Sequence, residues 1–222
     1  MSLAGWAALI LAGGAGRRFA GAAPGDKLLA DLAGAPVIRR LAARVADAGF
    51  GEVVCITGAA HDRIKAALAG IDLRIIAAPD WAEGMAASLR AGVAALSPDA
   101  RGACLFLGDM PLVPVALCED LVAAAEASGY AARARCMGRP GHPVAFTRAA
   151  FADLLALKGD QGASALLAAR GLAVAYLDTA DRGALLDIDT PADLAALTAA
   201  WKTCATSATS ESATARGPLP KP

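Results

Sequence analysis

The sequence predicts an α/β fold in which a mostly parallel β-sheet lies between two layers of helices. Short apolar runs of strand length alternate along the chain with longer segments whose apolar residues recur at helical spacing. The apolar runs are continuous and rich in Val, Ile, Leu and Cys. Such runs are typical of parallel strands that helices cover on both faces, because strands with one exposed face alternate apolar and polar residues instead.

The first half of the chain repeats this strand and helix alternation. Ala7–Ala12 is an apolar run that ends in a glycine-rich turn. A helix is expected over Pro36–Ala48, because Pro stands at its first position and Gly49 follows its end. The same rhythm predicts strands at Glu52–Thr57, Leu73–Ala77 and Ala103–Leu107, and helices over His61–Ala69 and Met85–Leu96.

After a helix expected over Pro114–Ser128 the rhythm changes. Tyr130–Cys136 and Pro143–Thr147 flank the turn Gly138–Gly141, which indicates an antiparallel excursion from the sheet. Thr190 is expected to cap a last helix, since Pro and an acidic residue follow it in the first turn. The remaining expected elements are helices over Ala149–Leu157, Ala163–Ala169 and Pro191–Trp201, and a strand over Ala173–Leu177.

One domain is expected over residues 1–202, with a disordered tail over 203–222. The 222 residues suffice for a sizeable core without disulfide bonds or metals. The segment after Lys202 is small, polar and ends in prolines, so it offers little to bury. Truncation after Lys202 is therefore expected to preserve stability and activity.

Composition and charge exclude several classes of protein. The 21 basic and 21 acidic residues balance, which disfavours a nonspecific nucleic-acid or anionic-membrane partner. The uncharged opening, residues 1–16, is shorter than the ~18 apolar residues of a membrane span, and it lacks the charged start of a signal peptide. The 5 cysteines form neither an even set nor a CxxC pair, so a disulfide framework and a zinc site are disfavoured. A cytoplasmic location is expected.

A glycine-rich loop after the first strand is a candidate phosphate site, because open α/β sheets bind ligands at the carboxyl ends of their strands. Its glycines allow the chain to approach a phosphate, and Arg17, Arg18 and Lys27 supply positive charge for a triphosphate. The spacing matches neither the P-loop nor the dinucleotide-binding fingerprint, and a simple turn with solvated arginines remains the alternative. The other expected contacts with the nucleotide are Leu11, Ala12, Gly13, Gly14 and Gly16.

Three aspartates are candidate metal ligands. Asp109 follows an apolar strand, and Mg²⁺ binds one or two carboxylates together with substrate phosphates. In Leu185–Asp189, strand alternation places Asp187 and Asp189 on one face, so either is a candidate for the second ligand. The alternatives are a turn or cap role for Asp109 and a contact of Asp189 with the dipole of the next helix.

Two further polar clusters are candidates for binding substrates. The first turn of the helix after Trp81 brings Gly84 and Ser88 to the same edge, where they are expected to meet the base or ribose. His142 and Asp160 lie in the antiparallel excursion, the expected place of an acceptor pocket, although a single histidine is more often structural. No Ser/His/Asp or Cys/His arrangement is evident, which disfavours a covalent nucleophile.

The motifs taken together resemble those of MobA-like nucleotidyltransferases, and most closely those of molybdenum cofactor cytidylyltransferases. LAGGAGRRF, EGMAASL, GDMP, RPGHPVAF, GDQGA and DIDTPADL occur in that family's order between about Ala7 and Trp201. The resemblance implies a three-layer, Rossmann-like nucleotidyltransferase fold that joins CMP from CTP to the terminal phosphate of a molybdenum–pterin, with Mg²⁺ and release of pyrophosphate. It also implies a receiving molybdoenzyme or its chaperone as a partner.

The same resemblance implies roles for individual residues. Leu11–Arg18 corresponds to the family's phosphate loop, Lys27 to its lysine and Asp109 to its metal aspartate, with the second metal position at Asp187 or Asp189. The LAGG opening resembles the guanylyltransferase branch, and EGMAASL carries alanines where cytidylyltransferases usually carry serines. The larger set of motifs favours CTP, with GTP as the alternative.

Simple chemistry supports transfer without a strong base. The acceptor phosphate is already an anionic nucleophile, so the barrier lies in bringing two anions together, which a metal and cations over the triphosphate relieve. Two other classes remain as alternatives: a dinucleotide-binding dehydrogenase and a regulatory module that binds a nucleotide without turnover. The first lacks a ribose-binding acid after the second strand, where Thr57 and Gly58 stand.

Overall fold

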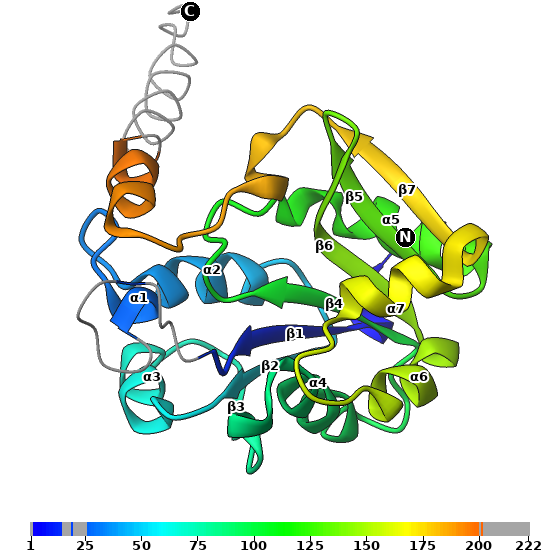
Figure 1. Cartoon of the computed structure of the whole chain (residues 1–222), viewed down its shortest axis with the longest axis horizontal. Helices are drawn as coiled ribbons and strands as arrows, with labels where there is room; N and C mark the ends of the chain where they lie inside the picture. Colours follow the sequence, from blue (N-terminus) through cyan, green and yellow to red (C-terminus); the bar gives the residue numbers. More distant parts are fainter. Residues whose placement is uncertain (1, 15–18, 20–25, 200, 202–222) are drawn as a thin grey trace, which may run out of the picture.

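A seven-stranded sheet organises the computed structural model, which describes residues 2–14, 19, 26–199 and 201 (Figure 1). The strand order is β3-β2-β1-β4-β6-β5-β7, and all neighbours run parallel except β6, which is antiparallel to β4 and β5. The strands are β1 Ala7–Ala12, β2 Glu52–Thr57, β3 Arg74–Ala77, β4 Gly102–Leu107, β5 Ala131–Cys136, β6 Arg139–Thr147 and β7 Val174–Thr179. The mostly parallel sheet and its antiparallel excursion confirm the predicted fold class.

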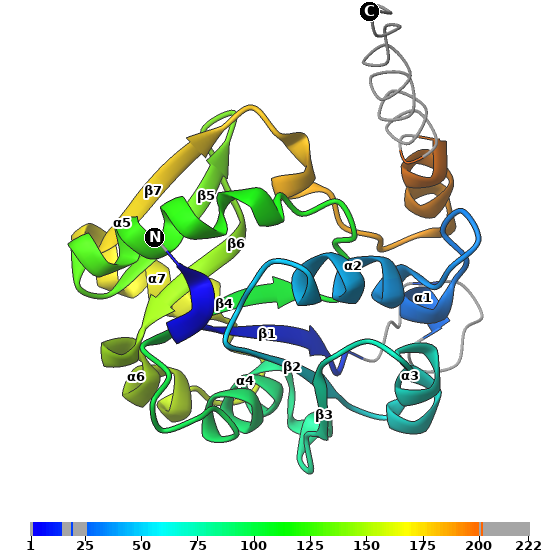
Figure 2. The same cartoon turned by 180° about the vertical axis from the view of Figure 1, so that it is seen from behind.

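Helices cover both faces of the sheet and complete three layers (Figures 1 and 2). The first face carries α1 Asp26–Leu29, α2 Val37–Ala46, α3 His61–Ala67 and α5 Cys118–Ser128. The second face carries α4 Met85–Ala94, α6 Phe151–Ala156 and α7 Ala163–Arg170. A last helix over 191–199 packs its Leu197 with Leu32 and Val37, close to α1 and α2.

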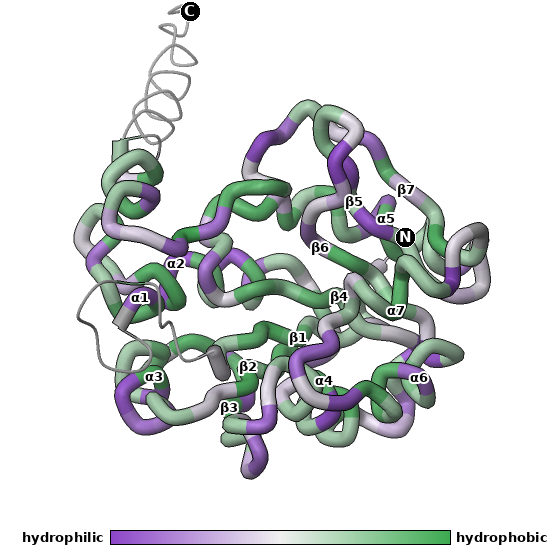
Figure 3. The backbone as a smooth tube through the Cα atoms, in the orientation of Figure 1, coloured by the Kyte–Doolittle hydropathy of each residue, from purple (hydrophilic) through white to green (hydrophobic). Residues whose placement is uncertain are grey.

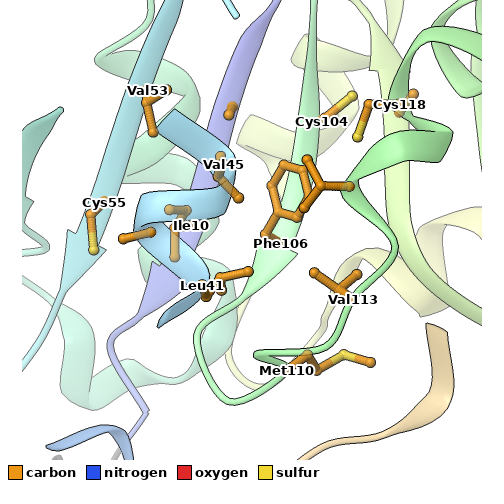
Figure 4. Close-up of a cluster of buried hydrophobic side chains, with 14 of the residues drawn as sticks. Ile10, Leu41, Val45, Val53, Cys55, Cys104, Phe106, Met110, Val113 and Cys118 are labelled. Atoms are coloured by element: carbon orange, nitrogen blue, oxygen red, sulfur yellow. The ribbon is translucent and has the colours of Figure 1, made fainter. Parts of the chain in front are cut away.

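Strand β1 shows why its apolar run is continuous. All six of its residues are buried: Ala8 and Ile10 point into the core beneath α2 and α5, and Leu9 and Leu11 point into the core beneath α4. Figure 3 accordingly shows apolar colour along the central strands. In the first core, Phe106 of β4 lies near Ile10 and the α2 residues (Figure 4), and its ring meets that of Phe50 edge to face at 6.0 Å.

The hairpin between β5 and β6 differs from the sequence prediction. The turn consists of Met137 and Gly138, which both have positive φ, whereas a turn over Gly138–Gly141 was expected. Arg139 pairs with Cys136 and Pro140 with Arg135, so β6 begins at Arg139 instead of Pro143. Two positive-φ residues form the tight turn whose twist matches that of the strands, which lets the ladder continue to its tip.

Two further expectations are corrected near the chain's ends. Lys27 lies in the short helix α1 and not in a loop, and residues 186–189 form no strand but follow a 3₁₀ turn over Arg182–Leu185. The predicted cap is confirmed: the Thr190 hydroxyl accepts a hydrogen bond from the Asp193 amide, and the Asp193 carboxylate accepts one from the Thr190 amide. The predicted tail over 203–222 lies outside the described residues. Among the described residues, no helix has the length and apolar content of a membrane span.

Candidate active site

Asp109, Asp187 and Asp189 converge where β4 ends. Asp109 follows β4, and the Ile188 amide donates a hydrogen bond of 3.0 Å to the Asp109 carbonyl. Ile188 is fully buried, which anchors the segment so that its two aspartates flank the end of β4. One carboxylate oxygen from each aspartate lies within 4.8 Å of the others. The alternation predicted for Asp187 and Asp189 therefore holds, although no strand ladder supports it.

Lys27 enters this acidic cluster from α1. Its Nζ lies 2.6 Å from Oδ2 of Asp109 and 3.2 Å from Oδ1 of Asp189, and its side chain is only 13% exposed. Burial alone lowers the pKa of Lys27, but the charges and hydrogen bonds of Asp109 and Asp189 outweigh burial and raise it. The ammonium group therefore stays charged and neutralises part of the cluster.

Asp187 is the member of the cluster that faces solvent. Lys27 forms ion pairs with Asp109 and Asp189 but not with Asp187. Partial burial and the charges of Asp109 and Asp189 raise the pKa of Asp187. A cation bound here would offset that repulsion, because it attracts all three carboxylates.

The donor set fits a hard divalent cation. Mg²⁺ and Mn²⁺ prefer carboxylate oxygens, and because Asp187 is exposed and the other two carboxylates are partly so, positions remain for substrate oxygens and water. With metal–oxygen bonds of about 2.1 Å, two ligand oxygens lie at most about 4.2 Å apart. The carboxylates, whose oxygens lie within 4.8 Å of one another, thus need only a small shift to bind one ion. The Lys27 ammonium already contacts one oxygen of Asp109 and one of Asp189, so it would compete with such an ion.

The first residues of the predicted phosphate loop lie beside α4. Leu11 and Ala12 end β1, and the Leu11 carbonyl accepts a 2.8 Å hydrogen bond from the Gly108 amide. Gly13 lies directly against Ser88, because a Cβ at Gly13 would come within 2.5 Å of the Ser88 hydroxyl. Gly14 is exposed, and a Cβ added there would meet no atom within 4 Å. Gly16, Arg17 and Arg18 lie outside the described residues.

Gly84 and Asp160 lie together at the start of α4. A Cβ at Gly84, whose φ is +121°, would meet Oδ1 of Asp160 at 2.4 Å. The Ala86 amide donates a 3.1 Å hydrogen bond to the Gly159 carbonyl. The Gly159 carbonyl therefore pairs with one of the backbone amides at the start of α4. Asp160, which was expected near the acceptor, lies beside Gly84, which was expected near the nucleotide.

His142 lies on β6 with a neighbour that sequence analysis missed. Its Nδ1 is buried and has no hydrogen-bond partner among the described residues. Burial and the nearby charge of Arg133 lower the pKa of His142 to about 4, against a hydrogen bond with the Leu105 backbone that raises it. Arg133 carries a signal that sequence analysis did not use, because it is a charged residue within the otherwise apolar start of β5.

Two close backbone contacts hold the segment that leads to Asp187. A Cβ at Gly141 would lie 2.3 Å from the Ala184 carbonyl oxygen, and a Cβ at Gly183 would lie 2.1 Å from that of Leu112. The 3₁₀ turn over Arg182–Leu185 is thus wedged between β6 and the chain that follows Asp109. Side chains larger than hydrogen do not fit at these two positions.

Gly183→Ala is expected to lower the free energy of unfolding by about 1–3 kcal/mol, because the added methyl group forces backbone apart. Urea unfolding measures the change. Arg182→Ala is the matched control, because the neighbouring side chain is exposed and should be replaceable at little cost. Equal stability of the Gly183→Ala protein and the wild type would show that the turn is not tightly wedged.

The sequence matches a known family of nucleotide-using enzymes over most of its length. The model of a family described as MobA-like NTP transferase domain matches residues 8–175. The matched range includes Lys27, Asp109 and His142 but ends before Asp187 and Asp189.

Curated relatives match parts of their own length. The bifunctional protein GlmU of Leifsonia xyli subsp. xyli is 35% identical over 129 residues, which are 57% of this chain and 26% of that protein. A probable molybdenum cofactor guanylyltransferase of Haloferax mediterranei is 36% identical over 117 residues, 53% of each protein. The chain thus spans about half or less of the length of these relatives.

A solved structure covers more of the chain. Rv0371c from Mycobacterium tuberculosis H37Rv is 30% identical with a TM-score of 0.74, over 87% of this chain and 97% of that one. A second structure of Rv0371c, at 28% identity and a TM-score of 0.72 over the same shares of 87% and 97%, is a complex with manganese. A divalent metal is therefore consistent both with a similar protein and with the three carboxylates.

Proposed function

The chain belongs to the MobA-like NTP transferase domain family, and we propose that it transfers CMP from CTP to the terminal phosphate of a molybdenum–pterin. Pyrophosphate is the second product. The observation that carries the proposal is the convergence of Asp109, Asp187 and Asp189 around Lys27 at the end of β4. A receiving molybdoenzyme or its chaperone is the protein partner that such a product requires.

The roles of the residues follow from their charges. Asp109, with Asp187 and Asp189, would hold Mg²⁺, which supplies charge stabilisation at the α-phosphate and at the leaving pyrophosphate. Lys27, together with Arg17, would then hold the triphosphate, so that the ammonium exchanges carboxylate partners for phosphate partners. The acceptor phosphate needs no general base, because it is already ionised at neutral pH.

The choice of CTP rests on motifs and on one contact. EGMAASL, GDMP and GDQGA resemble the cytidylyltransferase branch. The contact is that between Ser88 and Gly13, where a Cβ would come within 2.5 Å of the Ser88 hydroxyl, and the proposal places the smaller, pyrimidine base beside this pair. GTP is the alternative, supported by the LAGG opening and by the Haloferax mediterranei relative that is named a guanylyltransferase.

CTP is expected to exceed GTP by at least about ten-fold in kcat/KM, corresponding to ~1.4 kcal/mol. Wrong bases leave polar groups of a buried site unpaired, which costs enough for such a preference. Pyrophosphate release is measured with each nucleotide on the same molybdenum-loaded pterin, with a reaction lacking acceptor as the blank. A preference for GTP would place the protein among guanylyltransferases and leave the metal and phosphate roles in place.

The same assay separates transfer from nucleotide binding without turnover. A regulatory module has no need of three metal-binding carboxylates beside a lysine, which favours an enzyme. Binding of CTP with Mg²⁺ and no pyrophosphate release with any pterin phosphate would favour the module.

A further inference from the structure

Arg133 of β5 and His142 of β6 lie close together on the sheet face that α4, α6 and α7 cover. Arg133 Nε donates a 2.8 Å hydrogen bond to the carbonyl of Gly141, the residue before His142. Ala131 and Val144, two residues from each, are buried in the core beneath α4. Leu105 of β4 pairs with Val144, so His142 lies further toward the end of β4, where Asp109 follows.

Both side chains have hydrogen-bonding capacity that the protein leaves unused. The Arg133 guanidinium is half-buried, and among the described residues only its Nε has a hydrogen-bond partner. Nδ1 of His142 is buried, and none of the described residues forms a hydrogen bond with it. A buried, unpaired nitrogen costs free energy, which a ligand that pairs with it would recover.

The neighbouring Arg135 shows the contrasting case. It lies on the same strand and face, but its Nε and Nη2 bind the two carboxylate oxygens of Asp178 at 2.6 and 2.7 Å. The central carbon of its guanidinium also lies 5.1 Å from the centroid of the Tyr176 ring. The hydrogen-bond donors of Arg135 are therefore paired within the protein, whereas the guanidinium of Arg133 keeps donors that a ligand could use.

We propose that Arg133 and His142 form a subsite for an oxyanion, a phosphate or carboxylate group, of the acceptor substrate. A guanidinium binds such a group through two parallel N–H bonds, and Nδ1 of His142 beside it donates a third when the bound anion favours protonation of the imidazole. The identity of the acceptor rests on the proposed function, but the anion chemistry of the subsite does not.

The strand order places this subsite on the acceptor side. The predicted phosphate loop follows β1, Asp109 follows β4, and β6 and β5 come next in the order β1-β4-β6-β5. The carboxylate cluster thus lies between the candidate nucleotide loop and the Arg133–His142 pair. A substrate held there would approach the α-phosphate from the side opposite to the nucleotide loop.

The test uses the two histidines of the full chain as separate reporters. Nδ1 of His61 is already paired with the Thr57 hydroxyl at 2.7 Å, so His61 is an internal control. Inorganic phosphate and, in a second series, acetate are titrated while the imidazole signals are followed by NMR. Wild type, Arg133→Gln and the matched control Arg135→Gln are compared, with melting temperatures recorded for each.

Phosphate, acetate or both are expected to shift the His142 signals saturably and to leave His61 unchanged. An anion beside Arg133 also favours protonation of His142, so its pKa should rise from about 4. Arg135→Gln should behave as wild type, and Arg133→Gln should bind the anion at least about ten-fold more weakly. If phosphate saturates at a lower concentration than acetate, the subsite binds a phosphate group, and the reverse order indicates a carboxylate.

No saturable shift of His142 in the wild type, or equal binding by Arg133→Gln, would overturn the subsite. Turnover supplies an independent readout: Arg133→Gln should raise the KM for the pterin acceptor about ten-fold and leave the KM for CTP unchanged. An increase confined to the KM for CTP would also overturn it. Anion binding at His142 without any transfer to a pterin would retain the subsite and remove the proposed function.

Discussion

Asp109→Asn is expected to lower the rate of pyrophosphate release about a thousand-fold or more while the protein stays folded. The substitution keeps the shape of the side chain but removes the charge that lies 2.6 Å from Lys27 and within the carboxylate cluster. Stabilisation of charge by a metal at the reacting phosphate is worth several kcal/mol, and ~4 kcal/mol corresponds to about a thousand-fold in rate.

Asp99→Asn is the matched control for this prediction. Asp99 is exposed and precedes β4, at the opposite end of the strand that Asp109 follows. Circular dichroism and thermal melting establish that both variants fold, and electron paramagnetic resonance of Mn²⁺ measures metal binding. A folded Asp109→Asn protein with a near-normal rate and normal Mn²⁺ affinity would remove Asp109 from the mechanism.

The sheet was predictable because burial on both faces leaves a clear pattern. β1 and β2 have the bounds that their apolar runs indicate, and the helices end within a few residues of their predicted limits. The hairpin was harder, since Pro140 argues against a strand, and the predicted strand therefore began only at Pro143. Both lie in β6, where a register shift opposite Arg133 and Arg135 accommodates the irregular pairing.

The candidate site was predictable in its acids and less so in its contacts. Asp109 was found because ligands bind where parallel strands end, and Asp187 and Asp189 because alternate residues of an extended segment share a face. The ion pairs of Lys27 join residues that are 82 and 162 positions apart, and local patterns carry no information about such distances. Arg133 was missed although a charged residue at the otherwise apolar start of a strand is a visible signal, and its unused hydrogen-bonding groups became apparent only in the packed structure.

Lys27→Met is expected to have opposite effects on metal binding and on transfer. The ammonium lies between Asp109 and Asp189, at 2.6 and 3.2 Å, where it competes with a divalent cation for the same oxygens. Methionine keeps a similar length of apolar side chain and removes the charge. Without nucleotide, Mn²⁺ should therefore bind at least about ten-fold more tightly, since removing one like charge at close range is worth ~1.4 kcal/mol or more.

Transfer should fall about a hundred-fold in the same variant, because the triphosphate loses a charge-assisted contact in both binding and the transition state. Added Mn²⁺ should raise the melting temperature of Lys27→Met more than that of wild type, since the cation then supplies the positive charge that the Lys27 ammonium places beside Asp109 and Asp189 in the wild type. Lys65→Met, at an exposed position of α3, is the control and should change neither quantity. Unchanged Mn²⁺ affinity in Lys27→Met would mean that the ammonium and the metal do not share a position, and lost transfer alone would then assign Lys27 to the triphosphate only.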